Sequence, residues 1–182
     1  MVYEEVMIDI ETLSTRPNAV IMTIGAIKFH RKGPLKKLEE MDQFYVRVSK
    51  ESCELAGMTI DESTVQWWSQ QDKDIRYEAL ENPVDRLDIK DALGKLTEWI
   101  GFSTLIWGNG SDFDCTILTE AYKLCNLKPP WSFWNTRDVR TALDFGKVRV
   151  FDLPKNSKHH PVHDCYRQIV GLKRSFENLK LT

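Results

Sequence analysis

The residues of this chain that could do chemistry are four acidic side chains and one histidine, which lie far apart in sequence. They are Asp9, Glu11, Asp114 and Asp164, with His159 five positions before the last. Clustered carboxylates repel one another unless cations neutralise them, and a pair of metal ions is the usual solution. A histidine beside such ions can take a proton from water. If one fold brings the five together, they predict metal-dependent hydrolysis of a phosphodiester bond.

Asp9 and Glu11 belong to the segment 6–12 (VMIDIET), which has the pattern of a strand. Alternate side chains of a strand point to opposite faces, so Met7, Asp9 and Glu11 share one face. Val6, Ile8 and Ile10 then share the other face. The two carboxylates would lie about 6 to 7 Å apart, which suits two ligands of a paired metal site. The alternative interpretation is a half-exposed strand with its polar residues turned to solvent.

Asp114 follows a predicted strand, 104–109 (TLIWGN), and opens a predicted helix that runs through Tyr122. Ligand sites of open α/β sheets gather at the carboxyl ends of such strands. Asp112 is a rival, and either aspartate could simply cap the helix. We favour Asp114 because the preceding Phe113 can anchor the turn in the core.

Asp164 lies near the start of the last predicted helix, 162–178, and His159 lies on the loop that enters it. Helix capping is the alternative role for Asp164. His160 and His163 compete with His159 for any role at this loop. A zinc site built from His159 and His163 lacks a convincing set of further soft ligands.

The remaining periodicity predicts further strands at 19–30 and 43–49 and helices at 63–71, 88–101 and 137–146, with Ser63 as a candidate cap. Three strands followed by helices that alternate with strands indicate an α/β fold with a mixed sheet. No repeat, low-complexity tract or linker divides the chain, so residues 1–182 are expected to form a single domain.

The composition is that of a soluble globular protein, with 42% hydrophobic and 29% charged residues and a formal net charge of −2. It carries no overall basic signature, but a nuclease needs only a local cationic path. A candidate path lies within 137–160, where a solvated face is the alternative; its cations are Arg137, Arg140, Lys147, Arg149, Lys155 and Lys158. The four cysteines show neither C-x-x-C spacing nor a pairing pattern with histidine. With no signal peptide or membrane-spanning stretch evident, we expect a cytoplasmic protein with no membrane partner.

Taken together, the acidic residues and the histidine resemble the three motifs of the DEDD superfamily of 3′→5′ exonucleases. The D-x-E motif matches Asp9–Ile10–Glu11, and the F-D motif matches Phe113–Asp114. The H-x-x-x-x-D motif matches His159 to Asp164, as in the histidine (DEDDh, DnaQ-like) branch; the tyrosine branch would need Tyr at position 160. Gly110 stands where this superfamily usually has Asn, and Asn109 lies one position earlier, so the turn before Asp114 departs from the common pattern.

Two longer segments, 64–68 (TVQWW) and 133–141 (FWNTRDVRT), are similar to the phage exonuclease A family and its mycobacterial exoribonuclease-like relatives. The resemblance then covers the chain from Met7 to about Lys173. It implies a ribonuclease H-like fold, with a mixed central β-sheet flanked by α-helices. It also indicates candidate substrate-binding residues in or beside the motifs: Thr12, Trp67, Trp68, Asn109, Arg137 and Arg140.

For several of these residues a second interpretation stays open. Trp67 and Trp68 could stack on the terminal base, which is worth about 1 to 3 kcal/mol per base, or they could pack in the core. Arg137 and Arg140 could bind backbone phosphate, or Arg137 could bridge to Asp138.

The resemblance further implies two Mg²⁺ or Mn²⁺ ions. Asp9 would bridge both ions, Glu11 and Asp164 would complete one site, and Asp114 would hold the other mostly through water. His159 would accept the proton of the attacking water, and a nucleoside 5′-monophosphate would leave.

The expected activity is therefore a 3′→5′ exonuclease acting on single-stranded DNA or RNA with a free 3′ end. The alternative is a non-catalytic nucleic-acid-binding or polymerase-associated module of the same fold. Similar enzymes commonly form homodimers, so a homodimer is one assembly to test.

Overall fold

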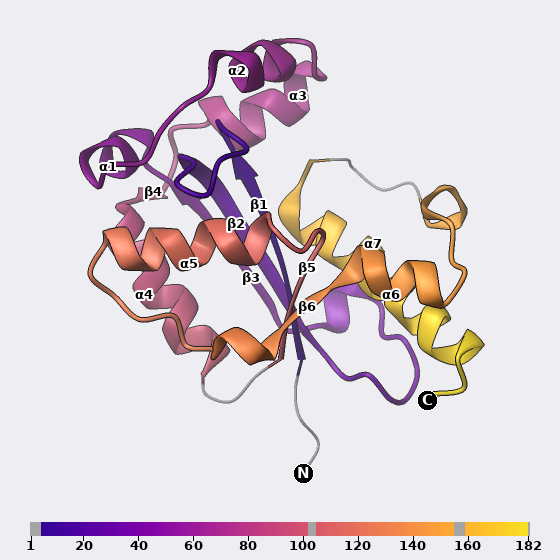
Figure 1. The fold of residues 1–182 in the computed structure, drawn as a ribbon. Helices are drawn as coiled ribbons and strands as arrows, with labels where there is room; N and C mark the ends of the chain where they lie inside the picture. Colours follow the sequence, from indigo (N-terminus) through magenta and orange to yellow (C-terminus); the bar gives the residue numbers. More distant parts are fainter. Residues whose placement is uncertain (1–4, 102–104, 155–158, 182) are drawn as a thin grey trace.

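Six strands form one mixed sheet in the order β4-β3-β2-β1-β5-β6, with helices on both faces (Figure 1). The computed structural model describes residues 5–101, 105–154 and 159–181. Strands β1, β2 and β3 pair antiparallel, whereas β3–β4, β1–β5 and β5–β6 pair parallel. The bounds of the strands are β1 Glu5–Thr12, β2 Ile21–Phe29, β3 Gln43–Val48, β4 Arg86–Leu87, β5 Leu105–Gly108 and β6 Thr136–Asp138.

The helices divide between the two faces and one end of the sheet. In Figure 1, α4 and α5 cover one face, α6 and α7 cover the other, and α1 to α3 gather at one end. Their bounds are α1 Lys50–Leu55, α2 Glu62–Ser69, α3 Lys73–Arg76, α4 Ile89–Ile100, α5 Asp114–Leu124, α6 Val139–Phe145 and α7 Pro161–Asn178. Short 3-10 helices occupy Leu38–Glu40 (η1), Phe133–Asn135 (η3) and Val150–Asp152 (η4), and a π-helical turn spans Tyr77–Glu81 (η2). No helix among these described residues is both long and apolar enough to cross a membrane.

The side chains of β1 alternate as the sequence predicts. Val6, Ile8 and Ile10 are buried in the core cluster that contains residues of α4 and α5. Met7 is buried in the second cluster, together with residues of α6 and α7. Asp9 and Glu11 share the face of Met7, which places both carboxylates on the side covered by α7.

A glycine lets α7 approach the sheet closely enough to reach these carboxylates. Gly25 of β2 pairs with Asp9 of β1, and the first residue of α7, Pro161, lies directly over it. A Cβ atom built on Gly25 would lie 2.4 Å from the Cβ of Pro161. Any side chain at position 25 would therefore push the start of α7 away from the sheet.

The predicted strands 6–12, 19–30 and 43–49 and the helices 63–71, 88–101 and 162–178 are confirmed within a few residues. Position 104, predicted to open a strand, lies outside the described residues. The helix predicted at 137–146 begins only at Val139, because Thr136–Asp138 pairs with β5 as β6. Ser63 is not a cap, because α2 begins one residue earlier with Asp61 at its N-cap. The short elements α1, α3, β4 and η2 were not predicted.

Candidate active site

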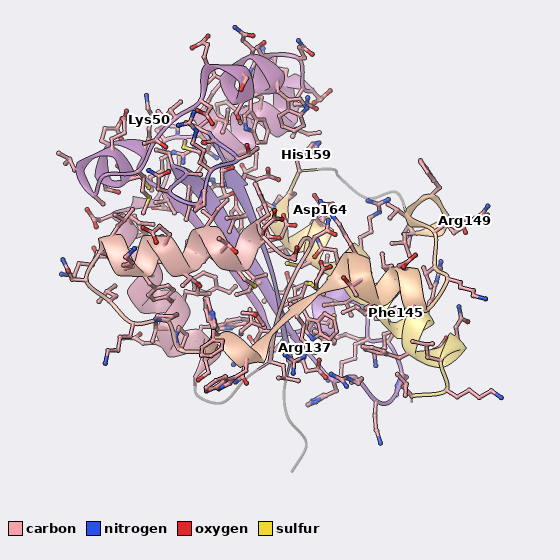
Figure 2. The ribbon with its side chains drawn as sticks, in the orientation of Figure 1. Lys50, Arg137, Phe145, Arg149, His159 and Asp164 are labelled. Carbon is pink, nitrogen blue, oxygen red and sulfur yellow. The ribbon has the colours of Figure 1, made fainter. Side chains whose placement is uncertain are left out.

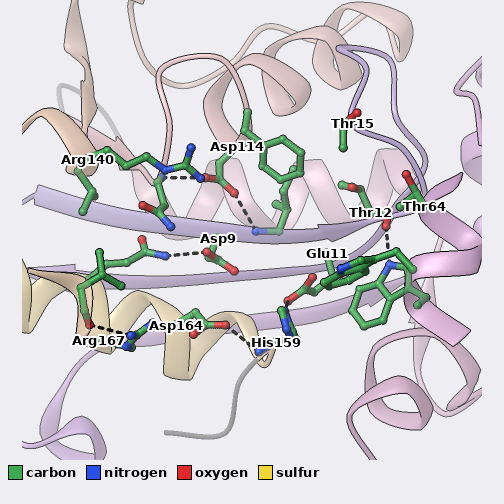
Figure 3. Close-up of a pocket in the computed structure, with 18 of the residues that line it drawn as sticks. Asp9, Glu11, Thr12, Thr15, Thr64, Asp114, Arg140, His159, Asp164 and Arg167 are labelled. Carbon is green, nitrogen blue, oxygen red and sulfur yellow. Dashed lines mark hydrogen bonds and ion pairs between the residues drawn. The ribbon is translucent and has the colours of Figure 1, made fainter. Parts of the chain in front are cut away.

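A cavity of about 580 Å³ opens where β1 and β5 end and where α5 and α7 begin (Figure 3). All five residues singled out in the sequence line it: Asp9, Glu11, Asp114, His159 and Asp164. They come from three separate segments of the chain, namely β1, the start of α5 and the start of α7 with its preceding loop. The fold therefore brings together residues that are far apart in sequence.

Asp114 is held by backbone N–H groups at the ends of β1 and β5. Its carboxylate accepts hydrogen bonds from the N–H of Ile10 at 3.2 Å and from the N–H of Asn109 at 2.8 Å. Gly108 allows the approach, since a Cβ there would lie 3.2 Å from the Cβ of Asp114. Asp112, the sequence rival, is exposed and does not line the cavity. The structure therefore places Asp114, and not Asp112, among the clustered carboxylates.

Asp9 has a partner that the sequence interpretation missed. The Nε2 of Gln168 donates a 2.7 Å hydrogen bond to its Oδ1. Gln168 lies four residues after Asp164 on α7, so helical spacing places both on one face of that helix. That spacing was the signal from which Gln168 could have been found.

Asp164 and His159 are tied to one another at the start of α7. The N–H of His159 donates a 2.8 Å hydrogen bond to the Oδ2 of Asp164. The backbone of His159 has φ +59°, which is uncommon for a residue other than glycine. Its Nδ1 lies 3.9 Å from the Oε1 of Glu11, and one ligand atom each of Glu11, His159 and Asp164 falls within 4.8 Å of the others. Next to it, the ring of His160 stacks on Tyr45 of β3, with centroids 4.9 Å apart.

Burial and mutual repulsion raise the pKa values of these carboxylates. Burial raises the pKa of Asp9 well above its ordinary value, and the charges of Asp114, Glu11 and Asp164 raise it further. Burial, followed by the charges of Asp164 and Asp114, raises the pKa of Glu11 from 4.5 to about 8. A buried set of oxygen ligands that resists ionising by itself is the environment that hard divalent cations such as Mg²⁺ and Mn²⁺ stabilise.

The Asp114 pKa is raised less, to about 6. Burial raises it, whereas the hydrogen bonds from Asn109 and Ile10 and the charge of Arg140 lower it. Within the cluster, Asp114 is therefore better prepared than Glu11 to be ionised at neutral pH.

Of the paired tryptophans of α2, one packs in the core and the other lines the cavity, where it could stack on a base. Trp68 is 2% exposed and its Nε1 donates a 2.9 Å hydrogen bond to the carbonyl of Thr12, so it is a core residue that supports the end of β1. Trp67 is 42% exposed and lines the cavity. Its ring meets those of Trp68 and His159 edge to face, each at 5.1 Å between centroids. Trp67 thus offers an aromatic surface beside the histidine.

The two arginines of the 133–141 segment also differ in position relative to the cavity. Arg140, on the first turn of α6, lines the cavity near Asp114, whereas Arg137 does not (Figures 2 and 3). The Nη1 of Arg137 donates instead to the carbonyls of Trp134 at 2.6 Å and Thr136 at 2.8 Å. Asp138 does not bridge to Arg137 in the described structure, because its carboxylate caps α6.

Other parts of the predicted cationic path and of the predicted site have mixed outcomes. Arg149 forms an ion pair with Asp152, and Lys155 and Lys158 lie outside the described residues. Thr12 and Asn109 line the cavity as expected. Several lining residues were not anticipated, namely Thr15, Ser63, Thr64, Val139, Leu143, Val150, Leu153 and Arg167.

Comparisons with known proteins agree on one kind of enzyme. The model of the 3′-5′ exoribonuclease Rv2179c-like domain family matches residues 4–174. The exodeoxyribonuclease of Enterobacteria phage T4 is 24% identical over 199 aligned positions, which cover 92% of this chain and 86% of that protein.

Two solved structures share the fold at low sequence identity. The metal-free complex of E. coli ExoI with single-stranded DNA superposes with a TM-score of 0.62 at 14% identity over 96% of this chain, which spans 40% of that one. S. pombe Pop2p, in its Mg²⁺- and Mn²⁺-bound form, superposes with a TM-score of 0.56 at 12% identity, covering 96% of this chain and 83% of that one. The mixed sheet with flanking helices is thus the ribonuclease H-like fold that the resemblance implied.

Proposed function

Because the chain belongs to the Rv2179c-like 3′-5′ exoribonuclease domain family, and is on that ground a 3′-5′ exonuclease, we propose that it shortens single-stranded nucleic acid from the 3′ end with the help of divalent cations. One observation supports this most directly: four carboxylates from three separate segments line one cavity beside a histidine and an exposed tryptophan. The mutual repulsion of four buried carboxylates would destabilise the fold unless cations balanced their charge.

Two ions, Mg²⁺ or Mn²⁺, fit this donor set, and we propose that Asp9, Glu11, Asp114 and Asp164 hold them. Bound divalent cations lower the pKa of water and stabilise charge on phosphate oxygens. Asp9 is the candidate for a shared ligand, because the charges of the other three carboxylates all act on it.

The remaining residues would position the reacting groups. His159 is the proposed general base that accepts the proton of the attacking water, and its backbone bond to Asp164 fixes the loop that carries it. Trp67 would stack on the terminal base, and Arg140 would neutralise a phosphate. Breaking the bond to the 3′ oxygen of the preceding nucleotide would release a nucleoside 5′-monophosphate.

Both DNA and RNA are proposed substrates. The description of the family names RNA, and that of the T4 relative names DNA. Discrimination depends on contacts with the 2′-hydroxyl of the ribose. The hydroxyl groups on the cavity wall, on Thr12, Thr15 and Thr64, are candidates for such contacts.

The decisive experiment follows single-stranded DNA and RNA of matched sequence, labelled at the 5′ end, with Mg²⁺, Mn²⁺ or EDTA. A metal-dependent ladder that shortens from the 3′ end is expected, and mononucleotide products should carry a 5′ phosphate. Asp114→Asn should lower the rate to that seen in EDTA. Asp112→Asn is the matched control, because it makes the same change two residues away, outside the cavity, and should keep the wild-type rate.

Binding of both strands without cleavage under every metal condition would instead identify a non-catalytic module. Equal rates for Asp114→Asn and wild type, after removal of contaminating nuclease, would show that the clustered carboxylates are not the catalytic centre.

A further inference from the structure

Two large aromatic side chains stand on the surface next to the edge of the sheet, although nothing in the cavity uses them. Phe133 is 76% exposed and Trp134 is 66% exposed, and their ring centroids are 4.0 Å apart. Both belong to η3, directly before the edge strand β6. Exposed aromatic pairs of this size commonly mark a binding surface.

The charged groups between this pair and the cavity favour a polyanion. Arg137 lies on β6 and Arg140 follows on α6, at the wall of the cavity. The one carboxylate on this stretch, Asp138, is engaged as the cap of α6 through the N–H groups of Arg140 and Thr141. The stretch therefore presents two guanidinium groups, and its one negative charge is partly neutralised by the helix terminus.

Arg137 still has donors to offer. Both of its hydrogen bonds within the described structure come from Nη1. A guanidinium has five N–H donors in a fixed fork, so Nη2 and Nε can donate to a phosphate without breaking those bonds. The bonds to the carbonyls of Trp134 and Thr136 hold the charge beside the aromatic pair.

We propose that Phe133, Trp134 and Arg137 form an upstream track, which holds the 5′-extending part of a single strand whose 3′ end lies in the cavity. This inference rests on the proposed exonuclease function and adds a second binding region to it. Bases would stack on the aromatic pair while Arg137 and Arg140 contact the phosphates between the pair and the cavity. Figure 2 shows Arg137 well separated from the labelled cavity residues His159 and Asp164.

The length of the track determines how long a strand must be to reach from the cavity to the aromatic pair. The four residue steps from Trp134 to Asp138 span at most about 14 Å of extended chain. At the roughly 3.4 Å rise of a stacked strand this corresponds to about four nucleotides. A trinucleotide would then fill the cavity without reaching the aromatic pair, whereas a longer strand would reach it.

A second copy of the chain is the competing occupant. A two-fold interface centred on the pair would bring the arginines of two copies together, which repulsion between like charges disfavours. The strand of nucleic acid is favoured because its phosphates complement these arginines.

The first test compares kcat/KM for a trinucleotide and for a strand of about 20 nucleotides. In the double variant Phe133→Ala/Trp134→Ala, the long strand should lose at least about 10-fold, the effect of removing one stacked base, and the trinucleotide should be unaffected. Phe145→Ala is the matched control, because Phe145 is an aromatic side chain of similar exposure (68%) at the far end of α6. Equal losses on both substrates, or no loss on either, would overturn the proposal.

The second test needs no cleavage. Anisotropy of a labelled long strand in EDTA, at several salt concentrations, should show weaker binding by the double variant. Arg137→Ala should reduce the slope of log K against log salt by about 0.7, the value for one phosphate contact with a single strand. If binding depends on the aromatic pair but no strand is cleaved, the exonuclease function is rejected and the upstream track is kept. If cleavage is normal but binding does not depend on the aromatic pair, the track is rejected and the exonuclease function is kept.

Sedimentation at the assay concentration decides whether the aromatic pair binds a nucleic-acid strand or a second copy of the chain. The mass of the double variant should equal that of wild type. If the wild type is a dimer and the double variant is a monomer, the aromatic pair joins two copies of the chain, and the track would be rejected.

Discussion

The Nε2 of Gln168 donates a 2.7 Å hydrogen bond to the Oδ1 of Asp9, from one turn beyond Asp164 on the same helix. Gln168 is only 7% exposed, and its Oε1 is buried without a partner among the described residues. The bond lowers the pKa of Asp9, against the burial and the three neighbouring charges that raise it. Gln168 thus favours the ionised form of Asp9 that a cation requires.

Replacing this amide should weaken metal binding more than it weakens the fold. In Gln168→Leu, a side chain of similar size no longer orients Asp9, and about 10- to 100-fold of metal affinity or activity should be lost, as for other residues that support metal ligands. The measurement is activity against Mn²⁺ concentration, with kcat taken at saturation. Gln43→Leu, an exposed glutamine that donates to the carbonyl of Leu38, is the control. An unchanged Mn²⁺ titration in Gln168→Leu would show that the bond is only structural.

The raised pKa of Glu11 predicts how metal-free stability changes with pH. Its pKa rises from 4.5 in the unfolded chain to about 8 in the fold, chiefly through burial. Between these values the folded state holds more protons than the unfolded state, so stability falls as pH rises. Burial lowers the pKa of His160 below 6.5 and gives the opposite slope below that value. The clearest window is therefore pH 6.5 to 8.

The measurement is Tm in EDTA across this window. Wild-type Tm should decline toward pH 8, Glu11→Gln should flatten the decline, and Mg²⁺ or Mn²⁺ should cancel it by stabilising the ionised carboxylates. A wild-type Tm that stays level or increases from pH 6.5 to 8 in EDTA would contradict the prediction.

The close contact between Gly25 and α7 should make a single methyl group costly for the active site. In Gly25→Ala the new Cβ would lie 2.4 Å from the Cβ of Pro161 and 2.8 Å from the backbone of Val162. The start of α7 would have to shift, and His159 and Asp164 would shift with it. Overpacking of this kind costs about 1 to 3 kcal/mol of stability, and kcat should fall further than the loss of folded protein explains.

Gly94→Ala is the control for Gly25→Ala. Gly94 lies within α4, and a Cβ there would have no neighbour within 4 Å. Alanine is favoured over glycine in a helix by about 1 kcal/mol, so this variant should be slightly more stable and fully active. If Gly25→Ala behaves like Gly94→Ala, the placement of α7 does not depend on the glycine.

The strands and the carboxylates were predictable because their patterns are local. Alternation along 6–12 gives the faces of β1, and the positions after strand ends or before helices locate Asp114 and Asp164. Strand β6 was not predicted, and its last two residues were assigned to a helix, because three residues of an edge strand carry too short a pattern. The preceding Phe113 favoured Asp114 over Asp112 in the sequence, and the cavity lining confirms that choice. The backbone donors that hold Asp114 could not be predicted locally, because they come from β1 and from the end of β5.

Long-range contacts account for the rest. The helical spacing from Asp164 places Gln168 on the right face of α7, but only the approach of α7 to β1 shows that it meets Asp9. Arg137 and Arg140 look equivalent in sequence, yet the turn from β6 into α6 leaves only Arg140 at the cavity. The exposure of Phe133 and Trp134 depends on the end of the sheet at β6, which no periodicity within 133–141 reveals.

The two tryptophans of α2 should respond to substitution in opposite ways. Trp68 is buried and bonded to the carbonyl of Thr12, so Trp68→Ala should cost about 3 to 5 kcal/mol of stability, measured by urea unfolding. Trp67 is 42% exposed at the cavity, so Trp67→Ala should leave stability nearly unchanged and raise KM for a trinucleotide by about 10-fold through lost stacking. Trp67→Phe should restore most of the binding, because a ring remains beside His159. A trinucleotide KM that is the same in Trp67→Ala and wild type would show that Trp67 does not contact the terminal base.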